Sequence, residues 1–151
     1  MLRVEEIETF YGASQALFGM SLKITSNEVV TLIGRNGMGK TTTVNAIMGI
    51  VRPSSGCIMF EADVITRAPA YLIARYGIGL VPEGRQVFPN LSVRENLVAT
   101  AANRFNSRNP WTIERVLAIF PELEARMTSM ANLLSGGEQQ MLAIGQIGRA
   151  S

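Results

Sequence analysis

Residues 34–41 have the types and spacing of a loop that binds nucleotide phosphates. They read GRNGMGKT and follow an apolar, β-branched run at 29–33, which completes the strand–GxxxxGK[ST]–helix pattern. Glycines let successive backbone N–H groups converge on phosphate oxygens at the positive end of the next helix. A glycine-rich turn that happens to contain a lysine is the weaker alternative, because a buried strand and a helix are both predicted to flank the loop.

Each position of this loop has an expected role. Lys40 should reach the β- and γ-phosphates as a movable point charge. The Thr41 hydroxyl should be a ligand of Mg²⁺, and Thr42 should lie on the α-phosphate side. The predicted nucleotide-binding residues are Gly34, Arg35, Asn36, Gly37, Met38, Gly39, Lys40, Thr41 and Thr42.

A second candidate site lies at residues 134–139, which read LSGGEQ. Ser135 and Glu138 match a capping box, in which each side chain bonds the backbone N–H of the other residue. The start of such a helix is positively polarised and attracts anions. The Ser-x-x-Glu spacing alone would also suit an ordinary capped helix, so the pattern needs support from the rest of the chain.

The elements that position these residues are expected to form an α/β portion followed by a helical arm. Alternating and continuous apolar runs predict strands, and periodic segments, one of them starting at the Ser92–Glu95 capping box, predict helices. The strands are expected at 2–10, 17–24, 29–33, 57–60 and 78–81. The helices are expected at 41–50, 69–76, 92–104 and 112–120, with loops at 106–110 and 132–137. We therefore divide the chain into residues 1–91 and 92–151.

Composition narrows the class of protein. The chain has 151 residues, of which 47% are hydrophobic and 17% charged, so a single globular domain with a substantial core is expected. No apolar run approaches the ~18 residues of a membrane span, and a cytoplasmic protein is the default. The single cysteine, Cys57, excludes an internal disulfide and is expected to be a small buried residue. The net charge of +2 is spread over scattered arginines, which argues against a nucleic-acid partner.

The phosphate-binding loop followed by LSGGEQ resembles the ATP-binding cassette (ABC) proteins. The resemblance implies a P-loop NTPase (ABC ATPase) core of the α/β class, with N-terminal antiparallel strands and a helical arm, incomplete at the C-terminus. It implies that ATP and Mg²⁺ lie between the P-loop of one subunit and the signature residues of another. Those signature residues are Ser135, Gly136, Gly137 and Glu138. A second ABC ATPase subunit, identical or different, is therefore an expected partner.

Two further positions gain a role from this resemblance. Tyr11 resembles the aromatic residue that stacks on adenine, although a core tyrosine at a strand end is an equally good interpretation. Glu83 occupies the Q-loop position, where most ABC proteins have glutamine. Its carboxylate could offer an oxygen to Mg²⁺ or to water, but its charge would repel the γ-phosphate. The alternative is a polar turn residue after Pro82.

Longer segments indicate a subfamily. GRNGMGKTTT, DVITRAPAYLIARYGIGLVPEGRQVFPNLSVRENL and LSGGEQQMLAIG are similar to the second ATPase subunit of branched-chain amino acid importers. This implies a transport-coupled ATPase on the inner face of the cell membrane, bound to membrane permease subunits and indirectly to a periplasmic substrate-binding protein. Residues 84–93 would meet the membrane partner. The alternatives are a urea or amide importer, a soluble ABC protein of translation or repair, and a non-catalytic nucleotide-binding remnant.

Hydrolysis in this family uses an Asp-Glu pair after the signature and a later histidine. The sequence has no histidine, and its only aspartate is Asp63, expected in a turn. We therefore expect the chain to end before these groups, to lack ATPase activity, and to fold poorly alone because strands at 29–33 and 78–81 would lack partners. Residues 146–151 are interpreted as foreign to the family pattern. Gly145 and Gly148 are expected to weaken the last helix by ~1 kcal/mol each.

Overall fold

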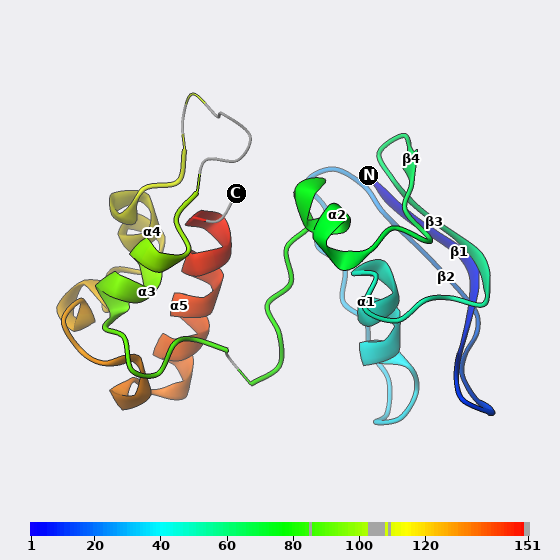
Figure 1. Ribbon diagram of the computed structural model, residues 1–151, viewed down its shortest axis with the longest axis horizontal. Helices are drawn as coiled ribbons and strands as arrows, with labels where there is room; N and C mark the ends of the chain where they lie inside the picture. The colour runs from blue at the N-terminus through cyan, green and yellow to red at the C-terminus, as the bar shows by residue number, and fades with distance from the viewer. Residues whose placement is uncertain (85, 103–107, 109, 150–151) are drawn as a thin grey trace. The chain divides into compact units, whose positions relative to one another are not determined.

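A computed structural model describes residues 1–84, 86–102, 108 and 110–149 of the protein. The chain divides into two units, Met1–Ile78 and Gly79–Ser151 (Figure 1). This division falls earlier than the predicted boundary at 91/92. Residues 79–91 belong to the second unit because their backbone is bonded there: Pro89 O accepts from Asn132 N–H at 3.2 Å and Leu91 O from Ala131 N–H at 2.9 Å.

The first unit is built on an antiparallel sheet. Its strands are β1 (Leu2–Tyr11), β2 (Ser14–Ile24), β3 (Ser55–Phe60) and β4 (Asp63–Val64), in the order β2-β1-β3-β4. β1 and β2 form a hairpin whose register runs from Leu2↔Ile24 to Tyr11↔Ser14, which confirms the predicted antiparallel pair. Asp63, expected in a turn, is in β4 and pairs with Phe60. Gly56 is required beside β1, because a Cβ there would collide with the carbonyl oxygens of Glu5 and Glu6.

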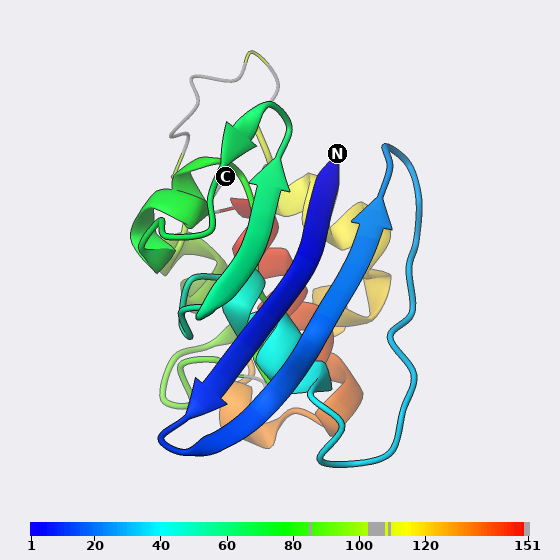
Figure 2. The same cartoon turned by 90° about the vertical axis from the view of Figure 1, so that its right-hand side faces the viewer.

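Two helices accompany this sheet, α1 (Lys40–Ile47) and α2 (Ala70–Arg75). Figure 2 shows α1 behind the sheet, crossing β1 and β2. The alternation along the strands turns apolar side chains to the inside, where burial is the main stabilising term. The core of the unit contains Val4, Ile7, Leu17, Ala46, Met48, Ile58, Ile65 and Ile73, all buried. Cys57, expected in this core, is only half-buried.

The two predicted buried strands at 29–33 and 78–81 are not strands in the structure. Residues 29–33 belong to the long loop that leads from β2 to α1 (Figure 2), with Val29 94% and Ile33 87% exposed. A strand needs neighbouring backbone for its N–H and C=O groups, and the sheet of the described residues provides no ladder for this segment. Residues 78–81 have no regular secondary structure, and the division of the chain into two units falls between residues 78 and 79.

The second unit is helical, as predicted. It consists of α3 (Val93–Ala99), α4 (Ile113–Ile119), the 3₁₀ helices η1 (Pro121–Arg126) and η2 (Ala131–Leu133), and α5 (Gly136–Arg149). α3 begins at the predicted capping box of Ser92 and Glu95 but ends at Ala99, before the expected residue 104. Residues 103–107 and 109, where the predicted loop at 106–110 falls for the most part, lie outside the described residues. α5 contacts α3, α4 and η1, and its Leu142 lies in a core with Val93, Leu97, Val116, Leu123, Ala131 and Leu134.

A buried amide pair joins α3 to α5. Asn96 is fully buried, and its amide donates to the carbonyls of Phe88, Leu91 and Ser92 while its Oδ1 accepts from Phe88 N–H at 2.8 Å. Gln146 donates its amide to the same Oδ1 at 2.9 Å. The last turns of α5 are therefore packed into the unit. Gln146 thus satisfies a buried acceptor, as a buried polar group requires, while the interpretation of residues 146–151 as foreign to the family pattern concerns their sequence and stays a prediction.

Candidate functional site

The P-loop has the backbone conformation that its glycines predict. Gly37 and Gly39 have φ angles of 84° and 83°, in the left-handed region that only glycine adopts at low cost. Gly39 is also the N-cap of α1. A Cβ at Gly39 would lie 2.6 Å from Leu17 Cδ2 and 2.9 Å from Ala16 O, so no other residue fits. The loop ends directly at the start of α1, where backbone N–H groups can bind an anion.

Lys40 is held over this loop. Its Nζ donates to the backbone carbonyls of Gly34 at 2.6 Å and Arg35 at 2.9 Å. The ammonium therefore lies at the mouth of the glycine-rich turn, and its two carbonyl contacts can be exchanged for phosphate oxygens. Residues 34–38 are exposed, so a ligand can reach the loop from solvent.

The threonines at the start of α1 differ in exposure. Thr41 is exposed, whereas Thr42 is only 9% exposed. Thr43 is buried and donates its hydroxyl to Gly39 O at 3.0 Å. The predicted contacts of the Thr41 hydroxyl with Mg²⁺ and of Thr42 with the α-phosphate side stay predictions.

Tyr11 lies at the end of β1 and is 50% exposed. Its partner across the hairpin is Ser14. The alternative of a core tyrosine is therefore wrong, and the ring has a face in solvent on which a base can stack.

Glu83 lies in the second unit, in a turn completed by Gly84 with a φ of 86°. Its side chain is exposed. Within the described ranges, no group of three or more His, Cys, Asp or Glu side chains could hold a metal ion. The predicted role of Glu83 as an oxygen donor to Mg²⁺ or to water stays a prediction.

The second candidate site is the signature motif at the beginning of α5, where a helix N-terminus could attract an anion. The Ser135 N–H donates to Glu138 Oε2 at 2.7 Å, and the Glu138 N–H donates to Ser135 Oγ at 3.3 Å. These two bonds confirm the capping box predicted from the sequence. They hold the pKa of Glu138 below its usual value, with the Ser135 bonds the largest cause and a nearby arginine the next. Ser135 and Gly137 are exposed.

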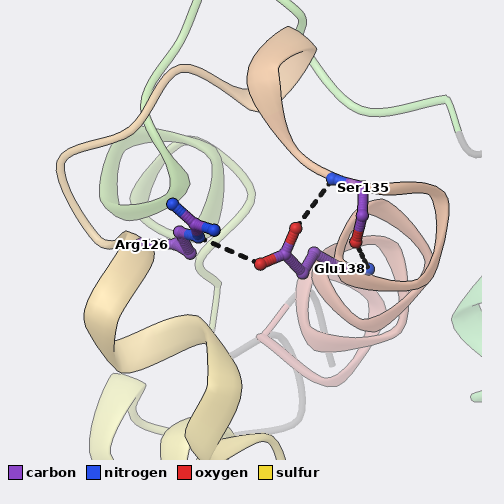
Figure 3. A network of polar contacts seen from close by, with 3 residues as sticks. All are labelled: Arg126, Ser135 and Glu138. Carbon is purple, nitrogen blue, oxygen red and sulfur yellow. Dashed lines mark hydrogen bonds and ion pairs between the residues drawn. The ribbon is translucent and has the colours of Figure 1, made fainter.

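The arginine that acts on Glu138 was not predicted. Arg126 ends η1, and its Nε donates to Glu138 Oε1 at 3.0 Å (Figure 3). Twelve positions separate the two residues along the chain, which is no spacing that a single helix or turn would bring together. Only the packing of η1 beside α5 creates the contact, so sequence patterns carried no signal for it.

An apolar hollow of about 260 Å³ lies on the helical unit. It is lined by residues such as Trp111, Val116, Phe120 and Ile144. Its lining side chains include no titratable or nucleophilic group. We therefore place the candidate site at the N-termini of α1 and α5 and not in this hollow.

Comparison with known proteins identifies the family. The ABC transporter family model matches residues 17–148, and the chain belongs to this family. It is 40% identical over 148 residues to the high-affinity branched-chain amino acid transport ATP-binding protein BraG of Pseudomonas aeruginosa, covering 97% of this chain and 63% of BraG. The lipopolysaccharide export system ATP-binding protein LptB of Escherichia coli is 34% identical over 145 residues, covering 95% of this chain and 60% of LptB.

A solved structure supports the same fold. A nucleotide-free ATP-binding cassette from an ABC transporter matches with a TM-score of 0.80 and 28% identity, over 97% of this chain and 64% of the other. The chain thus spans less than two thirds of the length of these relatives. No helix among the described residues is long and apolar enough to cross a membrane.

Proposed function

We propose that the protein is the ATP-binding subunit of an ABC importer, with branched-chain amino acids as the favoured class of solute. The observation that carries the proposal is the P-loop itself, where Gly39 has a left-handed backbone without room for a Cβ and Lys40 lies over the turn. The higher identity to BraG than to LptB favours an importer of branched-chain amino acids over an exporter.

Each residue of the first site has a role in binding ATP. The N–H groups at the start of α1 would bind phosphate, and Lys40 would leave the carbonyls of Gly34 and Arg35 for the β- and γ-phosphates. Thr41 would hold Mg²⁺, which would compensate the phosphate charge. Tyr11 would stack on the adenine. Glu83 would offer a carboxylate oxygen to Mg²⁺ or to water.

We infer that the signature motif serves the nucleotide of a second subunit. The two compact units carry one anion-binding helix start each: the P-loop lies in Met1–Ile78 and the signature in Gly79–Ser151. The signature residues of one subunit, Ser135, Gly136 and Gly137 with Glu138 as their cap, would close over ATP bound at the P-loop of its partner. Membrane permease subunits, and through them a periplasmic substrate-binding protein, complete the proposed transporter on the inner face of the membrane.

Hydrolysis requires more than these two sites. Phosphoryl transfer uses a carboxylate that holds Mg²⁺ and a residue that positions the attacking water. Glu83 could serve only one of these two roles, the sequence has no histidine, and its single aspartate is Asp63 in β4. We therefore expect residues 1–151 to bind ATP without turning it over, and transport-coupled hydrolysis to be an activity of a longer family member.

The chain offers a matched pair of variants for the first test, because it contains only two lysines, Lys23 and Lys40. Lys40→Ala should abolish binding of a fluorescent ATP analogue, whereas Lys23→Ala, in β2, should bind as the unmodified chain does. Circular dichroism checks that both variants fold alike. Equal affinity of the two variants would refute the P-loop assignment.

A second test addresses the shared site. Lys40→Ala subunits keep an intact signature, and Ser135→Arg subunits keep an intact P-loop. Neither variant should self-associate in ATP, but a mixture should associate, because one complete composite site forms in the mixed dimer. Failure of the mixture to associate, when the unmodified chain does associate in ATP, would refute the shared site.

A further inference from the structure

The Glu138 carboxylate at the start of α5 is fixed at both of its oxygens. Oε2 accepts from the Ser135 N–H at 2.7 Å, and Oε1 accepts from Arg126 Nε at 3.0 Å (Figure 3). The three residues come from η1, from the residue before α5 and from the first turn of α5. Among the described residues, Arg126 is the only ion-pair partner of Glu138.

The ion pair compensates the negative charge that Glu138 brings to the N-terminus of α5. The positive end of α5 attracts a phosphate, but Glu138 brings a negative charge to the same turn and already uses the Ser135 N–H. An uncompensated carboxylate there would repel an incoming triphosphate and could rotate away from its cap. Arg126 compensates the charge and, through a directed N–H···O bond, holds the carboxylate in one orientation.

The contact contributes little to the stability of the unit. The Arg126 side chain is 55% exposed, and exposed ion pairs are screened by water. The backbone around Arg126 is held independently, since its carbonyl accepts from Ser129 N–H at 2.8 Å and the neighbouring Leu123 is fully buried. Removing the guanidinium should therefore leave η1 and α5 in place.

We infer that Arg126 is a positioning residue for the signature motif: it fixes and neutralises Glu138 so that the start of α5 can accept the phosphates of a nucleotide. The inference rests on the proposed function, in which this start contacts ATP bound to a second subunit. Arg126 acts through Glu138 and need not touch the nucleotide.

The mixed dimer of Lys40→Ala and Ser135→Arg subunits tests this inference, because only one of its two Arg126 residues lies beside a signature motif that contacts ATP. In a mixture of Lys40→Ala and Ser135→Arg subunits, only the signature of the Lys40→Ala subunit is in use. Arg126→Gln added to that subunit should weaken ATP-dependent association about tenfold, the size expected for one charge-assisted hydrogen bond. The same change in the Ser135→Arg subunit should have no effect. Arg126→Lys should restore part of the association, and Arg94→Gln, at an exposed arginine of α3, is the control.

Association of the subunits is measured by sedimentation velocity. Equal losses in both subunits would mean a general folding defect, and no loss in either would mean that Arg126 is dispensable; both overturn the inference. In a Glu138→Gln background, Arg126→Gln should lose its effect, because no carboxylate is left to compensate. A persisting loss would overturn the action through Glu138. If the mixture without any Arg126 change fails to associate, the shared-site function itself is refuted and the inference falls with it.

Discussion

Replacing Gly145 with alanine should destabilise the helical unit, although alanine is the better helix former. A Cβ built at Gly145 would lie 2.8 Å from Val116 Cγ1 and 3.1 Å from Leu97 Cδ2. Both neighbours are buried, at 1% and 0% exposure, and have little room to move. Overpacking of this kind costs ~1–3 kcal/mol, whereas the gain in helix propensity is only ~1 kcal/mol. The expected net effect is a loss of ~0–2 kcal/mol.

Gly148, three positions further along α5, provides the matched control. The nearest atom to a Cβ there is Trp111 Cδ2 at 3.4 Å, an ordinary van der Waals distance. Gly148→Ala should therefore keep the propensity gain and stabilise the unit by up to ~1 kcal/mol. The two alanine variants are chemically the same change in the same helix, and the structure predicts opposite signs.

Urea unfolding followed by fluorescence measures this difference. Trp111 is the only tryptophan of the chain and lies against α5 at Gly148, so its emission reports on the helical unit. With an m-value of ~2 kcal/mol/M, a change of 1 kcal/mol moves the midpoint by ~0.5 M. Val116→Ala should relieve the crowding, so its cost should be smaller in the Gly145→Ala background than alone. A Gly145→Ala midpoint as high as that of Gly148→Ala, or above that of the unmodified chain, would refute the packing argument.

Three other predictions follow from the geometry. The capping serines lower the pKa values of Glu95 and Glu138 from the ordinary glutamate value of 4.5. The caps therefore contribute stability when the pH is above 4.5, and this contribution is lost as the pH falls through the lowered pKa values of the folded protein. Far-ultraviolet circular dichroism should show helix loss that begins below pH 4.5 and not above it. Asn96→Ala should cost ~2 kcal/mol in urea unfolding, because it removes the hydrogen bonds that the fully buried Asn96 amide makes to Phe88, Leu91, Ser92 and Gln146. Gly39→Ala should abolish ATP binding in a nucleotide titration, whereas Gly37→Ala, whose Cβ would meet nothing within 4 Å, should retain part of it.

Features defined by short spacings were predictable from the sequence. The two capping boxes depend on residues three positions apart, and both are formed as expected. The P-loop depends on glycines within eight consecutive residues, and the left-handed conformations of Gly37 and Gly39 follow from that pattern. The β1–β2 hairpin also follows from local alternation around a tight turn.

Features that depend on tertiary partners were not predictable in this way. The apolar run at 29–33 has the composition of a buried strand, but the described sheet pairs it with nothing and it is exposed. The bond from Gln146 to Asn96 spans 50 positions, so no local sequence pattern indicated it. Gly145 was judged by helix propensity alone, which omits the two side chains that occupy the space of its missing Cβ.

The N-termini of α1 and α5 have different charged side chains beside them, and this difference predicts the order in which they would bind a nucleotide. At the P-loop the cation is Lys40, whose bonds to its own loop carbonyls can be exchanged for bonds to phosphate. At the signature the charged groups are Glu138 and Arg126, which already bond each other. The first start therefore attracts phosphate with a positive charge, and the second offers only N–H and hydroxyl groups once its carboxylate is compensated. On the proposed function, ATP would bind first at the P-loop and the signature would close over it afterwards, which is why losing Arg126 should weaken association of subunits rather than binding of ATP to one subunit.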